Sequence, residues 1–73
     1  MKEKLAEYAH EAWSGWMRHL FSLSKTNADA SVTIPRELVN RWQRQMTTEY
    51  KDLTEIEKES DREEVQKILD IIK

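Results

Sequence analysis

A single glycine and a single proline occur among the 73 residues of this chain, so few positions can interrupt a helix. Charged residues make up 36% of the sequence. Scarce helix breakers together with abundant charge favour helices over a sheet. We therefore expect an all-α fold: a compact domain of three helices, packed orthogonally or as a bundle.

The first helix is expected from Lys2 to Ser24, because apolar residues recur there at spacings of three and four. Gly15 interrupts this pattern and costs about 1 kcal/mol relative to alanine inside a helix. Its missing side chain would let another element or a ligand come close. The apolar stripe consists of Leu5, Ala9, Ala12, Trp13, Trp16 and Leu20, and a second row beside it of His10, Met17 and Phe21.

The middle of the chain is expected to hold a loop and a shorter helix. Residues Ser24 to Ser31 contain turn formers and little to bury, which indicates a loop. Pro35 keeps the residue before it extended and suits the first turn of a helix, so the second helix is predicted from Pro35 to Met46. Arg41 and Arg44 fall on its polar flank, where they are either solvated or available to a phosphate.

The third helix is predicted from about Glu55 to Ile72. Thr54 opens the sequence TEIE, a capping box in which the threonine hydroxyl and the Glu57 carboxylate each satisfy an otherwise unpaired backbone N–H. Tyr50 and Leu53, in the short connection before it, are expected to fold back onto the core.

Between this cap and the apolar end of the third helix lies a stretch without any apolar residue, EKESDREE. On a helical wheel, Lys58 and Asp61 point toward the apolar side and Arg62 lies at its margin. Two interpretations remain open. The three residues are structural, capping or pairing with neighbouring charges, or they line a polar pocket walled by tryptophans and suited to an anionic, planar ligand.

Size and composition limit the function further. The chain is expected to form one domain, residues 1–73, with a marginal core. Small domains without disulfides often gain stability by oligomerising, so we expect this chain to form a homo-oligomer. It has no cysteine, in keeping with the cytoplasm, and a net charge of −2, which argues against binding DNA or RNA. No segment predicts a membrane span or a signal peptide.

No enzymatic chemistry is indicated. His10 and His19 point in nearly opposite directions on one helix, so they cannot share a metal, and we expect no metal site and no cofactor. No nucleophile and base are paired by spacing, and no glycine-rich phosphate loop exists. The three tryptophans, Trp13, Trp16 and Trp42, fall on predicted core faces, although a tryptophan face can also stack a base.

The two ends of the chain resemble the ryanodine-receptor repeat (RyR) domain. The first helix fits a pattern LAE..HE.W, and the later segment fits Y..L...EK..DR. The whole sequence is also similar to small proteins encoded by tailed bacteriophages. The matching positions are Leu5, Ala6, Glu7, His10, Glu11, Trp13, Tyr50, Leu53, Glu57, Lys58, Asp61 and Arg62.

This resemblance covers about half of the chain. The family's middle usually carries a loop with glycine and tyrosine, where this chain has its second helix, and the family commonly has a proline where this chain has Glu49. The resemblance implies a helical module that recognises nucleotides, so the leading hypothesis is a non-enzymatic phage protein of the host cytoplasm that sequesters a nucleotide-type signal of a host defence system.

In that scheme each predicted ligand-binding residue has a role. Trp13 and Tyr50 stack a base, and His10 and Asp61 hydrogen-bond base or ribose edges. The phosphate charge is held by Lys58, Arg62 and Arg44. One alternative is a protein-interaction module that docks on a host or phage protein. It would dock through a ridge of Trp16, Leu20 and Phe21 or through the open face of the second helix. The other alternative is a small structural subunit held together by its polar residues.

Overall fold

The computed structural model describes all residues from 1 to 73. Three helices dominate it, joined by a small hairpin and one turn of 3-10 helix. In chain order the elements are α1 (Lys2–Leu23), β1 (Lys25–Thr26), β2 (Val32–Thr33), α2 (Arg36–Met46), η1 (Tyr50–Asp52) and α3 (Glu55–Ile72). The helical fold class and the positions of the three helices are therefore confirmed.

The ends of the helices follow from local chemistry. The capping box at α3 is formed: the Glu57 backbone N–H donates to Thr54 Oγ1, and the Thr54 N–H donates to Glu57 Oε1, both at 3.2 Å. Pro35 immediately precedes α2, and its carbonyl accepts from the N–H groups of Leu38 and Val39. These contacts set the starts of two helices without any tertiary partner.

The segment expected to be a loop is in part a hairpin. β1 pairs with β2 in an antiparallel register, Lys25 opposite Thr33 and Thr26 opposite Val32. Ala30 takes a left-handed φ of 71° in the turn, although no glycine is present. Each strand has only two residues, which is too short for an alternating pattern to show in the sequence.

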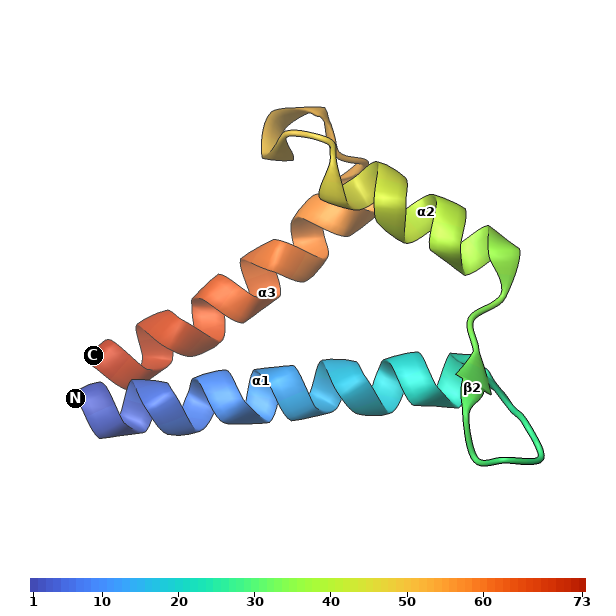
Figure 1. The fold of residues 1–73 in the computed structure, drawn as a ribbon. Coiled ribbons are helices and arrows are strands. Elements are labelled where there is room, and N and C mark those ends of the chain that lie inside the picture. The colour runs from blue at the N-terminus through green and yellow to red at the C-terminus, as the bar shows by residue number, and fades with distance from the viewer.

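The three helices are arranged as an open triangle (Figure 1). The N-terminal end of α1 meets the C-terminal end of α3, and α2 joins the far end of α3 at a corner. The Cα radius of gyration is 15.1 Å, with extents of 46 × 31 × 16 Å. A compact domain of this length has a radius of gyration of about 11 Å. The expectation of compact packing was wrong for the single chain.

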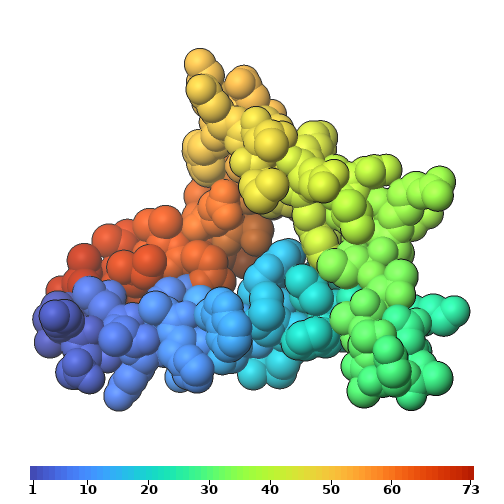
Figure 2. Space-filling view, viewed as in Figure 1, coloured from blue at the N-terminus to red at the C-terminus, as the bar shows by residue number.

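No residue of the chain is buried. The space-filling view shows the surface hollowed where the three helices face one another (Figure 2). Trp16 remains 45% exposed and Trp13 60% exposed, so the tryptophans predicted to form a core cover one another only in part. None of the helices combines the length and apolar character needed to cross a bilayer.

Candidate functional site

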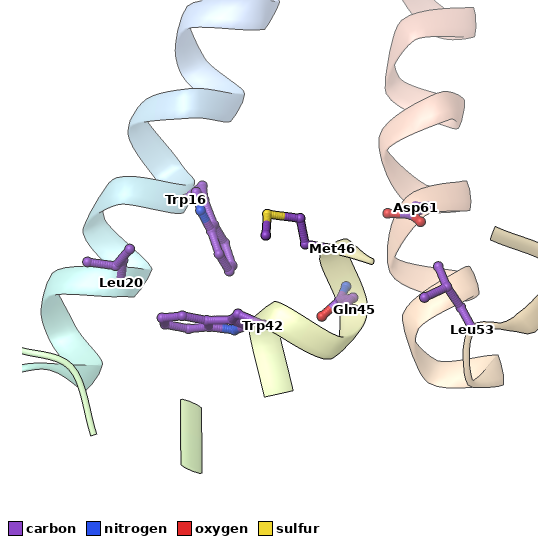
Figure 3. A pocket seen from close by; sticks show the side chains of 7 residues that line it. All are labelled: Trp16, Leu20, Trp42, Gln45, Met46, Leu53 and Asp61. Atoms are coloured by element: carbon purple, nitrogen blue, oxygen red, sulfur yellow. The ribbon is translucent and has the colours of Figure 1, made fainter. Parts of the chain in front are cut away.

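The three helices open onto a central, mostly apolar cleft. Trp16 of α1 meets Trp42 of α2 edge to face, with ring centroids 5.3 Å apart and planes at 66°. Asp61 of α3 brings the one carboxylate to the lining (Figure 3). The cleft has a volume of about 470 Å³, within the range of small-molecule sites, but it is open to solvent. Its lining consists of Trp16, Leu20, Trp42, Gln45, Met46, Leu53 and Asp61.

A second cleft, between α1 and α3, is polar. Glu64 and Lys67 of α3 line it opposite Gly15 and His19 of α1. The hydroxyl oxygen of Tyr8 is buried and makes no hydrogen bond. Another element or a ligand was predicted to come close to the chain at Gly15. In the structure Gly15 lines an open cleft.

Arg44 links α2 to α3. Its guanidinium donates to both carboxylate oxygens of Glu57, at 3.4 Å and 2.5 Å. The hydrogen bond from Arg44 lowers the pKa of Glu57, and the same bond raises the pKa of Arg44. Arg44 was predicted to be solvated or to hold a phosphate; it is paired with a carboxylate and also lines a third cleft, to which all three helices contribute.

Arg62 is held along α3 by two glutamates. Its Nη1 donates to Glu55 at 2.9 Å and to Glu59 at 3.2 Å. The hydrogen bond to Glu55, followed by that to Glu59, raises the pKa of Arg62. The bond from Arg62 likewise lowers the pKa of Glu55. These two ion pairs largely satisfy the charge of Arg62. Because both are solvent-exposed, their contribution to stability is small.

Lys58 lies over the ring of Tyr50, with its Nζ 5.7 Å from the ring centroid. Lys58 is half-buried and makes no ion pair, whereas Tyr50 is 48% exposed. Arg62 lies one helical turn beyond Lys58, on the same side of α3. Three of the residues predicted to bind a ligand, Tyr50, Lys58 and Arg62, therefore lie close together at the start of α3.

His10 and Trp13 are not part of this group. Their rings stack on each other, with centroids 6.2 Å apart, and neither lines any of the three clefts. Asp61 is exposed and lines two of the three clefts, the central one and the polar one between α1 and α3. The seven predicted residues are thus divided between the α3 corner, the cleft edges and the outer side of α1.

An exposed apolar stripe runs along the C-terminal half of α3. On α3, Val65, Ile68, Leu69 and Ile72 are 52%, 37%, 44% and 45% exposed. Helical geometry places this stripe roughly 100° from the residues of α3 that line the cleft against α1. The two helices therefore meet along their flanks, and the apolar stripe of α3 stays open to solvent.

Trp16 and Trp42 were predicted to form a core, and Gln45 was not predicted in any site, although all three line the central cleft. Trp16 and Trp42 had a signal, their aromatic side chains on predicted inward faces, while Gln45 had none. Comparison of the chain with family models, with curated proteins and with solved structures gave no match.

Proposed function

We propose that this chain is a non-enzymatic binding module whose apolar helix faces are covered by another polypeptide, in a homo-oligomer or in a complex with a different protein. The observation that carries the proposal is that three amphipathic helices leave no residue buried. Ordering the backbone of each residue costs roughly 1–2 kcal/mol, and burial of apolar surface is the main term that offsets this cost. A second polypeptide supplies the missing burial.

The shape of the chain supports the same proposal. Its radius of gyration of 15.1 Å exceeds that of a compact domain of equal length, and it has no disulfide to hold the open arrangement. Small chains without such cross-links commonly depend on oligomerisation. Large exposed apolar residues on all three helices, among them Trp13, Met46 and Ile68, mark the surfaces available for it.

Tryptophan fluorescence tests the proposal. At about 1 µM, where a weak complex dissociates, we expect red-shifted emission that iodide quenches strongly. Raising the concentration of the chain, or adding a protein that binds it, should shift the emission to the blue and reduce its quenching by iodide. A dilute monomer with blue-shifted, protected tryptophans and cooperative unfolding would show that the single chain completes its own core, and would overturn the proposal.

A second candidate function is binding of a nucleotide-type ligand, in the scheme where a phage protein sequesters a signal of a host defence system. The observation that favours it is the grouping of Tyr50, Lys58 and Arg62 at the start of α3, where Lys58 lies over the Tyr50 ring and Arg62 follows one helical turn later. Lys58 has no carboxylate partner and lies over an exposed aromatic ring, an arrangement that offers both a stacking surface and a positive charge.

Calorimetry against a panel of cyclic and linear nucleotides tests this candidate. We expect binding tighter than about 100 µM, or roughly −5.5 kcal/mol, to at least one of them. Lys58→Gln should weaken that binding, whereas Lys51→Gln, a change of the same type on the neighbouring turn, should not. If no nucleotide binds within this limit, or if both variants bind as the wild type does, the candidate fails.

A further inference from the structure

The exposed stripe of α3 has the spacing of a coiled-coil seam. Five positions, separated alternately by three and four residues, lie on one line along the helix: Lys58, Asp61, Val65, Ile68 and Ile72. A seam of this kind is matched by a second helix that carries the same spacing. The apolar part begins after Asp61 and runs to the end of the helix.

The chain leaves the apolar part of this seam open, whereas Lys58 at its start is half-buried beside Tyr50. The residues of α3 that line the cleft against α1 are Ser60, Asp61, Glu64 and Lys67, and only Asp61 belongs to both this cleft and the seam. Ile68, the least exposed residue of the stripe, is still 37% exposed, and Val65 is 52% exposed. An apolar stripe flanked by charged residues on both sides fits another amphipathic helix.

The charges along α3 favour a second copy of α3 as the pairing helix, in antiparallel orientation. Residues 55–64 hold six acidic and two basic side chains, whereas residues 65–73 hold Lys67 and Lys73 against Asp70 alone. Two copies of α3 in antiparallel orientation, aligned on Val65 and Ile68, place Asp61 of each copy opposite Ile72 and next to Lys73 of the other. A parallel pair would instead bring Asp61 against Asp61 and Lys58 against Lys58 in the seam, which opposes pairing.

We infer that two copies of this chain associate through an antiparallel, two-fold symmetric pairing of α3 with α3, centred on Val65 and Ile68. The inference rests on the proposed function, because it names a second copy as the polypeptide that covers the apolar surface. The apolar part of the seam, from Val65 to Ile72, is only about 10 Å long. This interface is small, so the dimer is expected to dissociate in the micromolar range.

Sedimentation equilibrium from about 1 to 300 µM measures the association. The wild type should approach twice the chain mass of 8.8 kDa at the upper end. Ile68→Lys should raise the dissociation constant at least tenfold. The matched control is Ile56→Lys, the same change on the opposite side of the same helix, at a residue that is 84% exposed; it should leave the constant within threefold.

Cysteine cross-linking tests the direction of the pair, and it does not depend on whether Ile68→Lys folds. The chain has no cysteine, so Asp61→Cys and Ile72→Cys introduce single thiols. When the two variants, one carrying a mass tag, are mixed and oxidised, an antiparallel pair should give mainly disulfides between position 61 and position 72. Mainly same-site disulfides, 61 to 61 and 72 to 72, would overturn the inference.

The results also separate the inference from the proposed function. If the chain stays monomeric at the highest concentration, pairing through α3 is ruled out. Pairing through α3 is also ruled out if Ile68→Lys and Ile56→Lys weaken the dimer equally. If that monomer has iodide-quenched tryptophans, the proposed binding of another polypeptide still holds. A monomer whose tryptophans are protected from iodide would rule out both the α3 pairing and the proposed function.

Discussion

Glu57 connects local and tertiary structure in this chain. Its carboxylate closes the capping box with the Thr54 backbone N–H and also accepts two hydrogen bonds from Arg44 on α2. The first contact is available as soon as the helix forms, and the second only when α2 has docked. One side chain therefore fixes both where α3 begins and where α2 lies relative to it.

Removing the hydroxyl of Thr54 tests the cap at this residue. Thr54→Ala leaves the Glu57 N–H without its acceptor at 3.2 Å, and we expect it to lower the free energy of unfolding by about 1 kcal/mol. Thr54→Ser keeps the acceptor and should change the free energy of unfolding by no more than about a few tenths of a kcal/mol. Chemical denaturation followed by circular dichroism measures both; equal effects of the two changes would contradict the capping role.

The Arg44–Glu57 pair makes a pH-dependent prediction. The hydrogen bond from Arg44 lowers the pKa of Glu57 below its reference value of 4.5, so the carboxylate favours the folded state. This stabilisation is present in full above about pH 4.5 and is lost as the pH falls through the lower, folded pKa.

Carbon-13 NMR titration of the Glu57 carboxyl measures the effect. In Arg44→Gln the Glu57 pKa should move up toward its ordinary value, and the difference in stability between wild type and variant should shrink as the solution is acidified. Glu63, which makes no ion pair, serves as the internal control. A Glu57 pKa that does not respond to Arg44→Gln would show that the two side chains are not paired in solution.

At the scale of the elements, the sequence predicted the helices well because their signals are local. The capping box, Pro35 and the periodic stripes place the ends of α2 and α3 within a residue or so of their observed positions. The hairpin was missed because its strands are too short for a periodic pattern, and its turn uses Ala30 where a glycine would have been the expected signal.

The candidate site was predicted only in part, because it depends on how each helix is rotated toward its neighbours. The apolar side of α1 is broad, and its sequence does not say which edge faces α3. Trp16 faces the cleft and Trp13 does not, although both lie on the same broad stripe. Tyr50 and Lys58 come together because they are close in sequence across the cap of α3.

Gly15 provides a prediction for α1 as an element. A Cβ added there would meet only the flexible end of Arg18, at 3.8 Å, so the site has room for alanine. We expect Gly15→Ala to stabilise the helix by about 0.5–1 kcal/mol, because glycine loses more backbone entropy on folding.

Thermal unfolding of Gly15→Ala beside Ala6→Gly measures this effect. The second change removes a methyl group at an exposed position of the same helix and should destabilise it by a similar amount. Should Gly15→Ala lower stability while Ala6→Gly behaves as expected, a second polypeptide must approach α1 at Gly15 in solution.

Under the proposed function, the whole molecule is one part of an assembly. Its three helices are specified by local signals, but the free energy that holds them in an open triangle cannot come from a core that the single chain lacks. Folding and association should then occur together, as they do in many obligate oligomers.

Coupled folding and association make the thermal midpoint depend on protein concentration. With an unfolding enthalpy of about 0.7 kcal/mol per residue, each tenfold increase in concentration should raise the midpoint by about 5 °C for a dimer. Circular dichroism melts over two decades of concentration measure the shift. Ile68→Lys should abolish it, and Ile56→Lys should retain it, since Ile56 lies on the opposite face of α3. A midpoint independent of concentration, with a cooperative transition, would mean that the helices are held together within one chain.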